Sequence, residues 1–208
     1  MTKCITFFCI VQLSILTANA QVNNRLKAEL DSIFYLDQLY RGLMGDATRK
    51  DSLMKAQQLK ASEVSRFIFD QMNRIDESNM KRVQQLINQY GYPGKTLVGI
   101  PTNEATWYVV QHSPNIEQYL LLIEQAGRQQ ELPFRLVAMM QDRHLMHQNK
   151  EQIYGTQVRC ENNECYVWPI RDPAGVNERR KQAGFTSTVE ENANRLGVVY
   201  SVRSLPKK

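Results

Sequence analysis

The strongest constraint on the fold is the spacing of apolar residues by threes and fours, which recurs along most of the chain. Between residues 24 and 44 these residues are Leu26, Leu30, Ile33, Tyr40 and Met44. This period places apolar side chains on one face of a helix. Similar stripes predict helices near residues 64–72, 78–90, 102–112, 115–127, 133–147 and 172–184, and a short one after Ser187. Residues 45–60 fit either a loop or a solvated helix.

Residues 157–168 depart from the helical period. Short runs with β-forming residues lie on both sides of a polar turn, and each run carries one cysteine, Cys160 or Cys165. This pattern predicts a β-hairpin closed by a disulfide. Redox-active pairs usually have two residues between the cysteines, and here there are four. The fold class expected is mainly α: a single orthogonal helical domain over 21–208, with one small β-hairpin near the C-terminal third.

Residues 1–20 have the organisation of a cleavable signal peptide. Lys3 precedes an apolar run, and Ala18-Asn19-Ala20 supplies small residues for cleavage before Gln21. The run is shorter than the roughly 20 residues that a membrane span requires. The expected location is therefore outside the cytoplasm, in the periplasm or secreted, with no integral membrane segment after cleavage. The net charge of +5 is mild and spread out, so no nucleic-acid partner is expected.

Polar residues interrupt several apolar stripes. The helix from Pro133 is apolar almost all round, yet it presents Asp142 and Arg143 side by side. Buried charges need partners. Asp37 is a candidate partner for Arg143 or for Arg41, and Asp142 is a candidate to orient the ring of His112. Such pairs are either internal salt bridges between helices or the wall of a polar cleft.

The segment Tyr154-Gly155-Thr156-Gln157 follows that helix and is expected to face back toward Asp142, with Gly155 permitting close approach or a positive φ. The alternative is a strand entry with solvated hydroxyls. His144 and His147 share a helix face, but neither an HExxH motif nor a carboxylate at a defined spacing accompanies them. No metal site is therefore expected. No cofactor is expected either, because phosphate-loop and dinucleotide motifs are missing from the sequence.

The ordered motifs resemble a bacterial domain-of-unknown-function family. They are Gly91-Tyr92-Pro93-Gly94 with Val98-Gly99, Gln111-His112, Asp142-Arg143, Tyr154-Gly155-Thr156-Gln157, and Pro169-Ile170 with Asp172-Pro173. Asp37-Gln38 with Arg41 is similar to its N-terminal motif, and Arg179 or Arg180 with Gly184 to its closing one. The resemblance covers residues 24–196. It implies a helical fold and brings no established activity.

Two functional hypotheses follow. In the first, the protein is an exported, hydrolase-like enzyme. His112, Asp142 and Tyr154 are its catalytic candidates, and a small molecule or peptide is bound by Arg143, Gln157, Asp37 and Gln111. In the second, it is a non-catalytic ligand-binding or envelope-associated protein in which the same residues are structural polar pairs. The two hypotheses differ in how strongly Asp142 should stabilise the fold.

Overall fold

The computed structural model describes residues 21–114, 116–162 and 164–206 of the 208-residue chain. The predicted signal peptide lies outside the described residues. Within them, the prediction of a mainly helical fold with one β-hairpin in its C-terminal third is confirmed. None of the described helices is long and apolar enough to cross a membrane.

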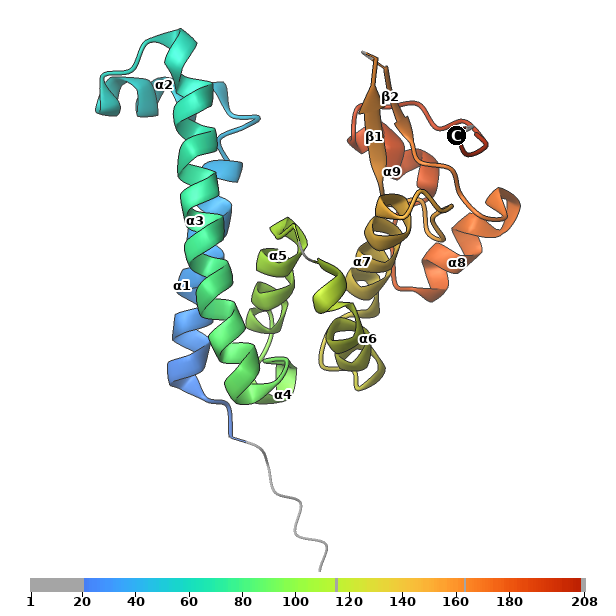
Figure 1. The fold of residues 1–208 in the computed structure, drawn as a ribbon, viewed down its shortest axis with the longest axis horizontal. Coiled ribbons are helices and arrows are strands. Elements are labelled where there is room, and N and C mark those ends of the chain that lie inside the picture. Colours follow the sequence, from blue (N-terminus) through green and yellow to red (C-terminus); the bar gives the residue numbers. More distant parts are fainter. Residues whose placement is uncertain (1–20, 115, 163, 207–208) are drawn as a thin grey trace, which may run out of the picture.

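Two long helices, α1 (Asn24–Arg41) and α3 (Ala61–Tyr90), lie side by side and form the N-terminal half (Figure 1). Leu30 of α1 and Val83 of α3 are fully buried in the core that the two helices share. Asp37 lies one turn after Ile33 on the buried side of α1. The apolar stripe that defines α1 therefore also carries this carboxylate into the interior.

The region between α1 and the end of α3 differs in part from the prediction. Residues 47–57 form α2 (Ala47–Gln57), a solvated helix with no buried residue. Two separate helices were expected at 64–72 and 78–90, and this was wrong, because α3 is one helix of 30 residues. The intervening residues 73–77 contain neither glycine nor proline, so nothing in them stops the helix.

A turn at residues 91–94 leads through α4 (Lys95–Val98) and η1 (Thr102–Glu104) to α5 (Ala105–His112), which packs on both α1 and α3. Neither Thr102 nor Asn103 caps α5 with its side chain. The two side chains instead bond to residues distant in sequence. α5 ends at His112, just before Pro114, as expected from the missing N–H of proline.

The second half follows the predicted order of elements. These are η2 (Ile116–Gln118), α6 (Leu120–Arg128), α7 (Phe134–His147), β1 (Val158–Glu161), β2 (Glu164–Val167), η3 (Pro173–Gly175), α8 (Val176–Gln182) and α9 (Val189–Arg195). β1 and β2 are antiparallel, with Cys160 opposite Cys165, and the predicted disulfide joins these two residues. The hairpin lies at the far end of the molecule from α1 and α3 (Figure 1).

The last two α-helices of the chain begin in different ways. Asp172, before η3 and α8, makes no side-chain capping bond and has a φ of +46°, and its carboxylate pairs with Arg179. The last helix, α9, begins with a capping box formed by Thr188 and Glu191.

Two main hydrophobic clusters hold these elements together. The larger cluster joins α1, α3 and α5 to α6 and α7, with Trp107 and Leu136 among its fully buried members. The second lies under the hairpin, α8 and α9, and includes Val167 and Val189. The predicted polar residues lie in and between these clusters, so their partners are fixed by helix packing.

Candidate functional site

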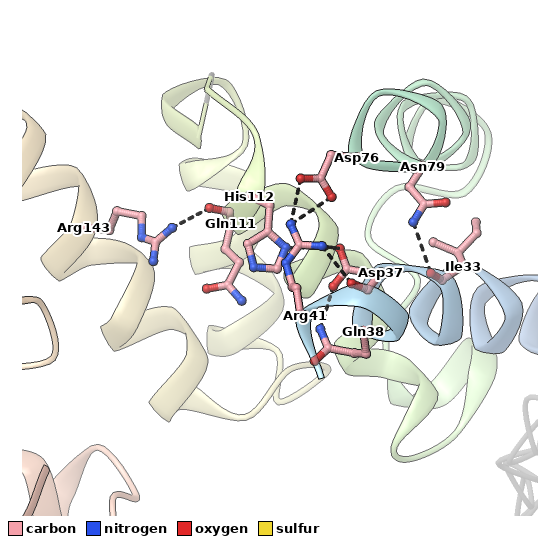
Figure 2. Close-up of polar contacts among 9 residues, drawn as sticks. All are labelled: Ile33, Asp37, Gln38, Arg41, Asp76, Asn79, Gln111, His112 and Arg143. Carbon is pink, nitrogen blue, oxygen red and sulfur yellow. Dashed lines mark hydrogen bonds and ion pairs between the residues drawn. The ribbon is translucent and has the colours of Figure 1, made fainter. Parts of the chain in front are cut away.

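The centre of the candidate site is a carboxylate–imidazole pair between α1 and α5. Asp37 is 1% exposed, and its Oδ1 lies 3.1 Å from Nδ1 of His112 (Figure 2). Its Oδ2 accepts a hydrogen bond of 2.6 Å from the amide of Gln38. Because a carboxylate only accepts hydrogen bonds, we assign the proton of the neutral His112 ring to Nδ1. Nε2 is then free of a proton and able to accept one.

Arg41 and Asp76 complete this group from α1 and α3. The guanidinium of Arg41 donates two hydrogen bonds, of 2.8 and 2.7 Å, to the two oxygens of Asp76. Its other terminal nitrogen donates to the backbone carbonyl of Asp37 at 2.7 Å and lies 3.4 Å from the Asp37 carboxylate. One cation thus bridges two carboxylates on neighbouring helices. Of the two partners proposed for Asp37, Arg41 is the one observed.

A hollow of about 410 Å³ opens beside His112. It is formed by α3 and the end of α5 and is lined by Asn73, Asp76, Glu77, Met80, Lys81, Gln84, Val109, His112, Ser113 and Pro114. The side chain of His112 is 21% exposed, whereas Asp37 behind it is shielded from solvent. The imidazole therefore lies between a buried acceptor and a solvent-reachable space. This is the arrangement that general acid–base chemistry requires.

Asp142 has a different environment from the one expected. It is fully buried and accepts backbone hydrogen bonds from Ile153 at 2.7 Å, Tyr154 at 3.1 Å and Thr156 at 3.0 Å. The hydroxyl of Thr156 adds a bond of 3.0 Å. The expectation that Asp142 orients His112 was wrong, because this loop surrounds its carboxylate. Burial raises the pKa of Asp142, against these hydrogen bonds, which favour the charged form.

The segment after α7 does face Asp142, as expected, although mainly through its backbone. Gly155 has a φ of +68°, and a Cβ there would lie 2.6 Å from Cγ2 of Val189. Any other residue at this position would be strained, and glycine lets the loop close around the carboxylate without that strain. The ring of Tyr154 packs at 6.3 Å from that of Phe185, and burial raises the pKa of its phenol.

Arg143 lies between the polar group around Asp37 and His112 and the polar group around Asp142. It donates a 2.6 Å hydrogen bond to the backbone carbonyl of Gln111, next to His112, at the C-terminal end of α5 (Figure 2). Its Nε also lies 3.4 Å from the side-chain oxygen of Gln157. Burial lowers the pKa of Arg143 from its usual value. A cation at the last carbonyls of a helix is favourable because these groups carry partial negative charge.

Gln157 belongs to the same polar group as Asp142. It is 7% exposed, and its amide donates to the hydroxyl of Thr156 at 2.9 Å. The structure therefore does not gather the predicted residues around one hollow. His112 and Asp37 lie at the hollow, Asp142, Tyr154 and Gln157 form a second group, and Arg143 with the carbonyl of Gln111 joins them.

Sequence reasoning missed Asp76 and Asn79, and partly missed Arg180. Asn79 is 4% exposed and donates to the carbonyl of Ile33, which fixes α3 against α1 one turn from Asp76 (Figure 2). The sequence did contain a signal for the burial of Asn79, because its spacing from Val83 places both residues on the buried face of α3. Arg180, noted only as part of the closing motif, is 1% exposed and donates to the carbonyls of Tyr154 and Ser187.

Asp37, Asp76 and His112 also offer ligand atoms within 4.8 Å of one another. Two carboxylates and an imidazole suit several divalent metals. In this cluster, however, the positive charge comes from the chain itself, because Arg41 contacts both carboxylates. The geometry thus describes a charged hydrogen-bonded network between three helices, with one imidazole at its edge.

These features define a mainly helical protein in which a buried carboxylate pairs with a partly exposed imidazole beside a polar hollow. The chain belongs to a family of unknown function, DUF6624, whose model matches residues 45–204. Asp37 and Arg41 precede the matched range, whereas Asp76, His112 and Asp142 lie within it. No curated protein and no solved structure matches the chain.

Proposed function

We propose that this protein is an exported, hydrolase-like enzyme in which His112 is the proton-transfer group. The observation that carries this proposal is the 3.1 Å contact between His112 Nδ1 and the buried carboxylate of Asp37, beside the hollow on α3. Such a carboxylate holds the ring in one tautomer and stabilises the imidazolium that forms when Nε2 takes up a proton. Asp37 thus takes the role that the sequence analysis gave to Asp142.

The surrounding residues support this division of roles. Arg41 and Asp76 fix the position of Asp37, and the hollow offers polar side chains such as Lys81 to a small molecule or to one residue of a peptide. In hydrolysis, Nε2 accepts a proton from water as the water oxygen bonds to the substrate. The imidazolium then returns that proton to the leaving group. Arg143 acts as a positioning residue, because it holds the end of α5 that carries His112.

Export is part of the proposal. It rests on the character of residues 1–20 and is compatible with the disulfide between Cys160 and Cys165. Structural disulfides persist mainly in oxidising compartments such as the periplasm or the extracellular medium. Fusion of residues 1–30 to a reporter that functions only after export should produce reporter signal. Failure of this fusion would contradict export and leave the chemistry of His112 untouched.

The catalytic proposal is tested with residues 21–208 on chromogenic ester, amide, phosphoester and glycoside substrates. The key variant is His112→Asn, whose amide nitrogen replaces Nδ1 and retains the bond to Asp37 while Nε2 is lost. We expect wild-type turnover of at least one substrate class and a decrease of about 10²-fold or more in the variant. Asp51→Asn, an exposed carboxylate on α2, is the matched control and should retain full activity. Turnover of none of these classes, or an unchanged rate in His112→Asn, contradicts the proposal.

The second candidate is a non-catalytic ligand-binding or envelope-associated protein. The observation that favours it is the surroundings of Asp142, whose hydrogen bonds all go to the loop that it stabilises. A thermal-shift screen distinguishes the two candidates. Saturable stabilisation by a small molecule that the protein leaves unchanged, lost on His112→Asn, supports the binding protein over the enzyme.

A further inference from the structure

A separate group of metal-ligating side chains lies where η2 meets the last turn of α7. Oε1 of Glu117 is 3.6 Å from Nδ1 of His144 and 3.6 Å from Nδ1 of His147. The sequence analysis set aside the two histidines because no carboxylate accompanied them at a defined spacing. Packing supplies one from 27 residues before His144. Two imidazoles and a carboxylate form a donor set that zinc commonly uses.

The distances do not fit hydrogen bonds. A separation of 3.6 Å is longer than an N–H···O bond, but it is close to the roughly 3.3–3.5 Å that separates two ligands bound about 2.0–2.1 Å from a tetrahedral zinc ion. Nδ1 of His144 is buried and has no hydrogen-bond partner among the described residues. A buried polar atom without a partner is costly, and here it faces the same carboxylate as its neighbour.

The charges also favour binding of a cation at Glu117 and the two histidines rather than at the Asp37 group, which consists of Asp37, Arg41, Asp76 and His112. Among the described residues, the ion-pair partners of Glu117 are these two histidines, which are uncharged in their neutral form. Both histidines lie in the last turn of α7, where the helix dipole favours positive charge. In the Asp37 group, by contrast, Arg41 already supplies the cation.

We propose that Glu117, His144 and His147 bind a zinc ion that joins the connection between α5 and α6 to the end of α7. Nδ1 of each ring is the ligand atom, and each Nδ1 must be unprotonated. These three side chains do not bring one ligand atom each within 4.8 Å of one another, so the ring of His147, which is 45% exposed, must turn inward to close the site. The amide of Gln148 lies 2.9 Å from Nε2 of His144. After turning over, this amide presents its oxygen to the Nε2–H, in the position that a carboxylate, a backbone carbonyl or a water takes beside most metal-bound histidines.

This site is independent of the proposed hydrolysis, since it uses none of the residues around Asp37. Because the ligand nitrogens must give up protons, zinc binding should weaken as the pH falls. Bound zinc would also fix the segment that follows His112. The consequence is a stabilised junction between the two halves of the main core.

The test is calorimetric titration of tag-free, chelator-treated residues 21–208 with zinc chloride at pH 7.5. Cobalt(II) absorption reports the coordination geometry. We expect one saturable site, with affinity reduced more than about tenfold in Glu117→Gln and His147→Gln, because even outer-shell changes cost 10–100-fold. Both residues are half-exposed, so these variants should fold.

Asp76→Asn is the matched control, because it removes a ligand from the Asp37 group only. Its zinc affinity should equal that of the wild type. If Asp76→Asn abolishes binding while Glu117→Gln and His147→Gln preserve it, the ion occupies the Asp37 group and the proposal is wrong. A titration without saturable binding to the wild type also overturns it. Neither outcome depends on hydrolytic activity, so the two proposals fail separately.

Discussion

Replacing Asp142 by alanine tests whether this residue stabilises the fold or is reserved for chemistry. The carboxylate is fully buried and accepts backbone hydrogen bonds from Ile153, Tyr154 and Thr156, which close the loop between α7 and the hairpin. Alanine removes all of these acceptor positions and supplies none. The backbone N–H groups of the loop are then left in a space that α7 and α8 shield.

The expected cost follows from these contacts. Each buried donor without an acceptor costs about 1–3 kcal/mol, and three backbone donors lose their acceptor. Part of this cost is offset, because the charged carboxylate no longer has to be buried. That burial is already unfavourable enough to raise the pKa of Asp142. We therefore expect Asp142→Ala to lower the free energy of unfolding by about 3–5 kcal/mol, as for other broken buried polar contacts.

Urea denaturation of residues 21–208 measures this quantity. The two tryptophans, Trp107 in α5 and Trp168 just after β2, are 1% and 0% exposed, so their fluorescence reports unfolding in both halves of the chain. Asp51→Ala is the matched control, because its carboxylate is 58% exposed and pairs with Lys55 one turn away. This control should unfold at nearly the wild-type urea concentration.

A loss for Asp142→Ala no greater than that for Asp51→Ala would refute the reasoning. The loop would then not depend on the carboxylate, and the burial of Asp142 would need a functional explanation. An increase in the free energy of unfolding would also indicate a functional role for Asp142, because strained groups at active sites often reduce stability. Asp142→Asn should give an intermediate loss, since it retains one acceptor oxygen.

Two further predictions concern the C-terminal half. The disulfide between Cys160 and Cys165 closes a loop with a sequence separation of only 5, so the double serine variant should lose about 2 kcal/mol in urea denaturation; an unchanged midpoint would contradict this. Gly155→Ala should lose about 1–3 kcal/mol because the added Cβ overlaps Val189. Gly184→Ala is the control that separates this clash from backbone strain. Gly184 also has a positive φ (+85°), but no atom lies within 4 Å of the added Cβ. An equal loss of stability in both variants would show that the overlap is not the cause.

Much of the fold was predictable because local periodicity and turn chemistry encode it. The stripe in α1, the end of α3 at Gly91, the start of α7 after Pro133 and the hairpin with its disulfide all follow from neighbouring residues. Helix continuity was less predictable. Residues 73–77 carry a single apolar residue, Ile75, which hid the continuity of α3, although the lack of glycine and proline there was a signal for it.

The candidate site was predictable in part. The sequence alone identified His112, Asp37 and Asp142 as polar residues in apolar surroundings, because each interrupts a regular pattern. It could not assign their partners. His112 pairs with Asp37, 75 residues away, and Glu117 lies against His144 and His147 across a helix connection. A sequence shows which side chains need a buried partner, since burial follows from local periodicity. Which partner each one finds depends on the angles at which helices pack, and these arise only from the whole core.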